Sequence, residues 1–127
     1  MALDVEKAKR AEVFTTVTGH GMDPNTDNAA EFLPLWRKLV VNGHSVQNNL
    51  WTEDNYLNPC RPQGGTWKYD RAGWGPGTVV DPWKVDVTDF VKSKSQFDYQ
   101  IQPYVNKAAV DGNPARHIIE SVLVLYR

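Results

Sequence analysis

The chain has 127 residues, of which 41% are hydrophobic and 23% are charged, and its formal net charge is −1. A length and composition of this kind are typical of one globular domain that buries a core of its own. Basic residues are interspersed with acidic ones, which argues against a nucleic-acid partner, and no apolar run is long enough to cross a membrane. Cys60 is the only cysteine, so the chain can form no internal disulfide.

The N-terminal segment, residues 1–12, is expected to be an extension that precedes the domain proper at residues 13–127. Its beginning shows a helical pattern, but a weak one. This segment contains charged residues at the positions where a secretion signal requires an apolar stretch, so we expect no signal peptide in this sequence. With a single cysteine, these features are as compatible with the cytoplasm as with any other compartment, and the localisation stays open.

From residue 11 onward the sequence alternates between apolar and polar residues, as strands that bury one face do. Asn42-Gly43 separates two such runs and predicts a tight hairpin, whereas Asp111-Gly112-Asn113-Pro114 predicts a second turn and Met22–Ala30 a loop. In chain order, the expected strands are 11–19, 37–41, 45–51, 83–91, 97–105 and 117–126. We therefore predict an all-β antiparallel sandwich of roughly seven or eight strands; alternation alone does not separate a jelly roll from an immunoglobulin-like topology.

The segment from Trp51 to Pro82 is a long irregular connection. Within it, residues 63–77 hold five glycines, two tryptophans, one tyrosine and an adjacent Asp/Arg pair. Glycine and proline at this density exclude a helix, and aromatic residues in a loop usually pack or meet a ligand. Two interpretations are equally favoured: a binding loop on a rigid scaffold, or an ordered loop whose tryptophans close one end of the sandwich.

The remaining tryptophans and the histidines are expected to have structural rather than catalytic or metal-binding roles. The histidines share no metal-ligand spacing with one another or with Cys60, so we expect neither a metal nor a cofactor. The tryptophans in or next to strands are expected in the core; these are Trp36, Trp51 and Trp83.

Several short strings extend the loop into a longer pattern. They are Gly19-His20-Gly21, Asn28-Ala29-Ala30-Glu31-Phe32, Val41-Asn42-Gly43, Gln63-Gly64-Gly65-Thr66-Trp67, Arg71-Ala72-Gly73-Trp74 and the closing run 117–126. Taken together, they resemble the C-terminal jelly-roll domain of the peptide-N-glycosidase F family over residues 13–127. The resemblance implies a jelly-roll sandwich and relates the chain to secreted bacterial amidases that release whole N-glycans from asparagine.

Three residues match positions of the family's substrate site. Glu31 matches its glutamate and is the catalytic candidate, because a carboxylate in apolar company suits general acid–base work. Arg71 matches an arginine beside the substrate cleft, and Trp74 matches a loop tryptophan that suits an N-acetylglucosamine ring; both are substrate-binding candidates. The structural alternatives are a solvent-facing glutamate, an Arg71–Asp70 ion pair and a tryptophan that plugs the core. We expect the three candidates to share one exposed cleft.

The chain also departs from the family pattern. The cysteines that flank the glutamate are Ala29 and Leu33 here, and the family's N-terminal jelly roll, with its principal catalytic aspartate, has no counterpart in the sequence. The chain thus resembles half of a glycoamidase site, which we expect to be inactive without a second jelly-roll domain. The alternative is a non-catalytic jelly-roll module that binds glycan or protein, or a redesigned scaffold patterned on this domain.

Overall fold

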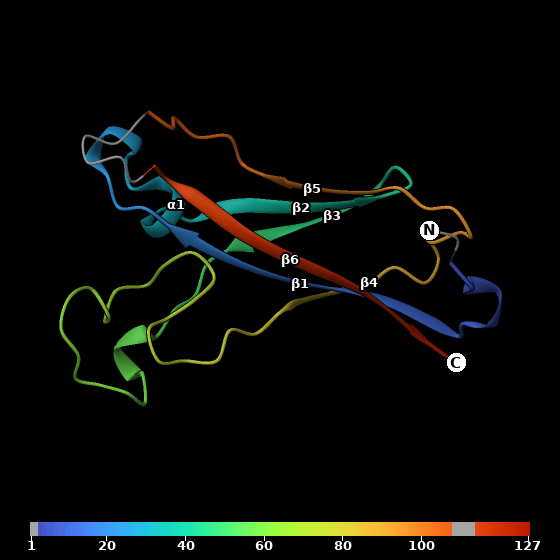
Figure 1. The fold of residues 1–127 in the computed structure, drawn as a ribbon, viewed down its shortest axis with the longest axis horizontal. Helices are drawn as coiled ribbons and strands as arrows, with labels where there is room; N and C mark the ends of the chain where they lie inside the picture. The colour runs from blue at the N-terminus through green and yellow to red at the C-terminus, as the bar shows by residue number, and fades with distance from the viewer. Residues whose placement is uncertain (1–2, 108–113) are drawn as a thin grey trace.

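A computed structural model of the chain describes residues 3–107 and 114–127. Its strands form two antiparallel three-stranded sheets that pack face to face, as Figure 1 shows. The first sheet has the order β4-β1-β6 and the second β3-β2-β5. The strands are β1 (Arg10–His20), β2 (Leu35–Val41), β3 (His44–Leu50), β4 (Trp83–Asp86), β5 (Phe97–Ile101) and β6 (Arg116–Tyr126). The predicted antiparallel sandwich is therefore confirmed.

The first sheet is built around β1, whose side chains alternate between the core and the outer face. Val13 and Val17 are buried, whereas Phe14 and Thr16 between them are half-buried. Along its full length β1 pairs with β6, and near its start it also pairs with β4. The predicted domain boundary after residue 12 falls inside β1.

The second sheet begins with a hairpin whose turn has the predicted residues. Asn42 and Gly43 have φ values of 49° and 88°, which both residues of a type I′ turn require. The turn sets Val41 opposite His44 and thereby fixes the register of β2 and β3. Since side chains alternate along a strand, residues 35, 37, 39 and 41 of β2 face the first sheet.

Apolar side chains of both sheets meet in two buried clusters. The larger combines Val13 and Val85 of the first sheet with Leu39 and Val41 of the second, and Trp83 packs against it as predicted. The smaller consists of Val17, Leu50 and Ala72. The prediction that Trp36 lies in the core is wrong. Trp36 is one residue out of phase with the buried Leu35 and lies on the outer face. There the Lys38 ammonium lies 5.0 Å from the centre of its ring.

The structure has fewer strands than the roughly seven or eight that the sequence predicts, and two of them, β4 and β5, are shorter than expected. In the described residues there are six, and β4 ends at Asp86 rather than near Val91. The Asp86 carboxylate accepts hydrogen bonds from the backbone N–H (3.0 Å) and hydroxyl (2.6 Å) of Thr88, and this local turn competes with the ladder. The turn predicted at 111–114 falls, except for Pro114, outside the described residues.

Helical structure in the described residues is confined to single turns. The 3₁₀ turns are η1 (Val5–Lys7), η2 (Pro24–Thr26) and η3 (Asn55–Leu57), and α1 (Ala29–Phe32) is one turn of α-helix within and just after the predicted loop. In Figure 1, α1 and the long green-to-yellow connection lie at one end of the sandwich, and both termini lie at the other.

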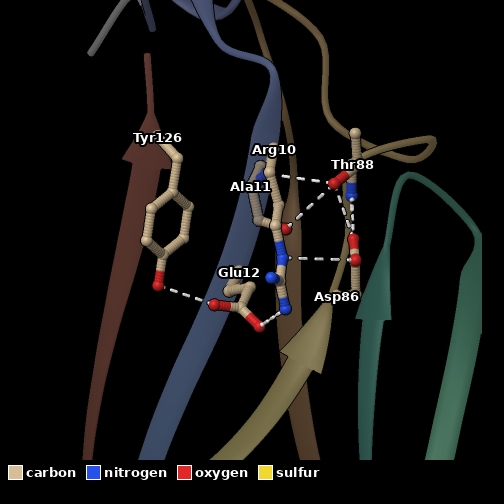
Figure 2. A network of polar contacts seen from close by, with 6 residues as sticks. All are labelled: Arg10, Ala11, Glu12, Asp86, Thr88 and Tyr126. Atoms are coloured by element: carbon tan, nitrogen blue, oxygen red, sulfur yellow. Dashed lines mark hydrogen bonds and ion pairs between the residues drawn. The ribbon is translucent and has the colours of Figure 1, made fainter.

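A polar network ties the three strands of the first sheet together at the terminal end (Figure 2). Glu12 of β1 is only 8% exposed, and its two carboxylate oxygens accept from Arg10 (2.5 Å) and from the Tyr126 hydroxyl of β6 (2.6 Å). Arg10 also lies 3.6 Å from the Asp86 carboxylate of β4. Because buried carboxylates require partners, this network satisfies Glu12 and holds β1 between its neighbours.

Candidate functional site

At the other end of the sandwich, α1 and the long connection are fastened to β1 and to each other. The Ala72 N–H donates to the Glu31 carbonyl (2.9 Å), and the Gly19 N–H donates to the Ala72 carbonyl (3.0 Å). Thr52 and Arg71 form an isolated antiparallel bridge that joins the start of the connection to its interior. These backbone bonds place Glu31, Arg71 and Trp74 beside the end of β1.

Two glycines make this approach possible. A Cβ atom on Gly19 would lie 1.7 Å from the Ala30 carbonyl oxygen, so only glycine lets β1 meet α1 this closely. Gly73 has φ +76°, and a Cβ there would lie 2.1 Å from the Val17 carbonyl oxygen. The chain therefore turns tightly between Arg71 and Trp74.

Glu31 and Arg71 form an ion pair in a nearly dry environment. The Arg71 Nη1 donates to Glu31 Oε1 at 3.0 Å, and the two side chains are 2% and 14% exposed. The guanidinium thus forms its ion pair with Glu31 and not with Asp70, the structural alternative expected from the sequence. Within the described ranges, Arg71 is the one side chain that donates a hydrogen bond to the Glu31 carboxylate.

The Arg71 guanidinium is surrounded on all its edges and on its faces. Its Nη2 donates to the Thr66 carbonyl and to Thr66 Oγ1 (3.2 Å), and its Nε donates weakly to the Tyr69 carbonyl (3.4 Å). The rings of Phe32 and Trp74 have their centres 5.0 and 4.8 Å from its central carbon. Desolvation lowers the pKa of Arg71, and the Glu31 charge opposes that shift.

These contacts correct one expectation about the site. Arg71 is 1% exposed, so it does not face an open cleft. The structure does bring Glu31, Arg71 and Trp74 into one cluster, but only Glu31 and Trp74 retain exposed surface.

Trp74 is held by its indole nitrogen. The Nε1–H donates to the Gly19 carbonyl (2.8 Å), and the His20 ring lies 5.1 Å away at a tilt of 35°. His20 Nε2 is 2.8 Å from Thr18 Oγ1. Burial lowers the pKa of His20, while the charge of Glu31 opposes this shift, so His20 belongs to the electrostatic surroundings of the site.

Three members of the cluster were not singled out from the sequence as site residues. Thr66 and Phe32 contact the guanidinium, and His20 packs beside Trp74. All three lie inside the strings that carry the family resemblance, which was the available signal. A threonine or phenylalanine has no titratable group to attract notice, and Gly-His-Gly is too short to be specific.

Next to this cluster, the outer face of the first sheet carries exposed aliphatic side chains among polar ones. Cross-strand partners lie on the same face, so Phe14 and Val122 stand together, and Ile118 stands beside Thr18. Ile118 and Val122 are 57% and 50% exposed, with the exposed Glu120 between them. Exposed aliphatic side chains rimmed by polar ones occur at surfaces that another protein or domain covers.

Among residues 3–107 and 114–127, no group of three or more His, Cys, Asp or Glu side chains could hold a metal ion. None of the helices described there has the length and apolar character needed to span a membrane. Cys60 is exposed and free, and its sulfur lies 3.4 Å from the Gly77 carbonyl oxygen.

Comparison with known proteins decides the family. The family described as "Peptide-N-glycosidase F, C terminal" matches residues 2–124. The chain belongs to this family. A curated relative, the peptide-N(4)-(N-acetyl-beta-D-glucosaminyl)asparagine amidase F of Elizabethkingia miricola, is 29% identical over 106 residues, which cover 77% of this chain and 30% of that protein.

Solved peptide-N-glycosidase F structures share the sandwich. A peptide-N(4)-(N-acetyl-beta-D-glucosaminyl)asparagine amidase crystal structure superposes with a TM-score of 0.78 at 25% identity, over 91% of this chain and 39% of that one. The enzyme from Flavobacterium meningosepticum, described as a glycosylasparaginase, gives 0.72 at 24% identity, over 94% and 40%. The chain thus spans less than half the length of these relatives.

Proposed function

We propose that this domain supplies one half of a glycoamidase site, which hydrolyses the amide bond between N-acetylglucosamine and asparagine together with a second jelly-roll domain. The observation that carries the proposal is the Glu31–Arg71 pair, assembled from strings that match the family. Water attack on an amide requires a base to take a proton and donors to stabilise the developing oxyanion. Glu31 is suited to the first task, as the general base.

We assign Arg71 the role of a positioning residue rather than a substrate contact. Its three nitrogens already donate to Glu31, Thr66 and Tyr69, and almost none of its surface is accessible. A guanidinium held in this way fixes the Glu31 carboxylate in one orientation. Trp74, which is half-buried, remains the candidate platform for the sugar ring.

The second half of the site is proposed to rest on the outer face of the first sheet. The chain covers 30% to 44% of the relatives' lengths, so the relatives possess a large portion without a counterpart here. The exposed Ile118 and Val122 lie on the same face as His20, next to the candidate site. A domain on this face would bury these side chains and close the site above Glu31.

The experiment is a chimera that joins this chain to the remaining portion of the Elizabethkingia miricola relative. Mass spectrometry of a denatured N-glycopeptide would follow the conversion of the glycosylated asparagine to aspartate. We expect conversion by the chimera, none by the isolated chain, and loss of conversion in the Glu31→Gln chimera. The matched control is Glu53→Gln, since Glu53 is exposed. Equal conversion with and without Glu31 would refute the assignment.

A specific observation favours the alternative, a non-catalytic module. An Arg–Glu pair buried to this extent is also a common structural device. Conversion by the isolated chain that disappears in Glu31→Gln would instead establish a complete site within one domain. Under the non-catalytic alternative, the chimera would be inactive although folded and able to bind the glycopeptide.

A further inference from the structure

Arg37 is a cation that points into the sandwich. It lies on β2 between Leu35 and Leu39, both buried, and shares their inward phase. Its guanidinium lies 4.7 Å from the ring centre of Trp83, which belongs to β4 in the opposite sheet. Charged residues on the inner face of a sheet are uncommon and are usually paired.

In the parts of the chain that the structure describes, Arg37 forms no ion pair with a carboxylate. Its Nε donates to a neutral acceptor, Asn48 Oδ1, at 2.7 Å. Burial lowers the pKa of Arg37, and the charge of Tyr99 and a side-chain hydrogen bond with it oppose that shift. A partly desolvated cation without an anionic partner is costly, so a ligand that offers further acceptors would offset its burial.

The guanidinium lines a partly open cavity of about 230 Å³, whose rim includes Val80 and the exposed Val79. Its apolar floor includes Val17 of β1 and Leu50 of β3. The polar and aromatic part of the lining is formed by Arg37, Trp51, Thr52, Trp74 and Asp81. Neither Glu31 nor Arg71 lines the cavity, which is therefore separate from the candidate site although Trp74 borders both.

The lining favours a ligand that is neutral, ring-sized and rich in hydroxyl groups. Arg37 can only donate hydrogen bonds, Asp81 can only accept them when ionised, and the Thr52 hydroxyl can do both. Arg37 and Asp81 are not paired with each other, and their opposite charges disfavour both anionic and cationic ligands. The indole ring of Trp51 suits the C–H face of a sugar, whereas the Trp74 ring already contacts Arg71 and His20 and borders the cavity.

We propose that this cavity, lined by the half-buried Arg37 and the exposed Asp81, binds one neutral sugar ring. The site does not depend on the amide chemistry of Glu31. Each sugar hydroxyl both donates and accepts, so one ring can satisfy Arg37 and Asp81 at the same time. A ligand of this size, bound without charge pairing, is expected to have a dissociation constant in roughly the millimolar range.

The test is an NMR titration of the isolated, isotopically labelled chain, with the tryptophan indole N–H signals as the readout. The ligands are glucose and N-acetylglucosamine, with glucuronic acid and glucosamine as charged counterparts. We expect the neutral sugars to shift the Trp51 and Trp74 signals saturably and the charged ones to bind more weakly. Tighter binding of glucuronic acid, or shifts confined to Trp36 outside the cavity, would overturn the proposal.

Matched variants locate the binding. Arg37→Met should weaken it by at least about tenfold, because hydrogen bonds to a charged donor are lost, whereas Lys38→Met on the opposite face should not change it. Asp81→Asn should also weaken binding. Because Asp81 is exposed, this variant should keep the fold and so provides a test even if Arg37→Met does not fold. Its control is Asp89→Asn, also at an exposed position. Unchanged affinity in both cavity variants would overturn the proposal.

Discussion

The Arg71 guanidinium and the Glu31 carboxylate, 40 positions apart in the sequence, meet at 3.0 Å with almost no access to solvent. The pair joins the long connection to α1 at the end of β1. It is at once an element of the proposed amidase site and a structural clamp, and the two roles are separable by experiment.

Removing the Arg71 guanidinium should destabilise the folded protein. Arg71→Met should lower the free energy of unfolding by about 3 kcal/mol, because it leaves Glu31 half-buried without its partner and the Thr66 carbonyl without its donor. Urea denaturation would measure the loss. In a cycle with Glu31→Gln, we expect a coupling energy of about 1 to 3 kcal/mol. The control is Lys68→Met, an exposed cation on the same connection. Equal, small losses in Arg71→Met and Lys68→Met would contradict a clamp.

Gly19→Ala should disrupt the contact between β1 and α1. The added methyl group would overlap the Ala30 carbonyl, and we expect a loss of about 3 kcal/mol or more. Since Trp74 bonds to the Gly19 carbonyl, its fluorescence should also change. Gly64→Ala is the control, because a Cβ there would meet nothing within 4 Å. A Gly19→Ala protein as stable as Gly64→Ala would show that the two segments can separate without penalty.

Acid should destabilise the protein through two histidines. Burial lowers the pKa values of His117 and His20 in the folded state, and for His117 the charge of His20 adds to this effect. Around its ordinary pKa of about 6.5, an unfolded histidine then binds protons more readily than a folded one. Their contribution to stability is therefore present above that pH and is lost as the pH falls toward the folded-state pKa values.

Urea denaturation at about pH 8 and about pH 5.5 measures this dependence. The difference in stability between the two conditions should be smaller in His117→Gln than in the wild type. His44→Gln should keep the wild-type difference, because His44 lies exposed at the start of β3. An unchanged difference in His117→Gln would assign the acid sensitivity to other groups.

Replacing the inward-facing arginine should have the opposite effect on stability from replacing Arg71. In Arg37→Met a desolvated cation without an anionic partner gives way to an apolar side chain of similar length, and Asn48, being exposed, can turn to water. We expect the free energy of unfolding to be unchanged within about 0.5 kcal/mol or to rise. Thermal unfolding of Arg37→Met beside Arg71→Met gives the comparison. A loss as large as that of Arg71→Met would mean that Arg37 is already well satisfied within the protein.

Local patterns in the sequence predicted much of the fold. Asn42-Gly43 predicted the hairpin because both residues adopt positive φ readily, and the alternation around Val13 and Val17 predicted β1 within one residue at each end. The strings around Glu31 and Arg71 predicted the family, which matches nearly the whole chain. These features depend on short stretches of sequence, and short stretches can be interpreted without the rest of the molecule.

The tertiary structure alone decided which distant groups meet and which side chains are dry. The sequence suggested Asp70 as the partner of Arg71, but backbone bonds through Ala72 and Gly19 bring Glu31 to it instead and bury it. The early end of β4 likewise depends on one local turn. The outward position of Trp36 and the inward position of Arg37 depend on the phase of β2 against the opposite sheet. Pairing across 40 residues is set by packing between segments, and composition, spacing and periodicity carry no direct record of it.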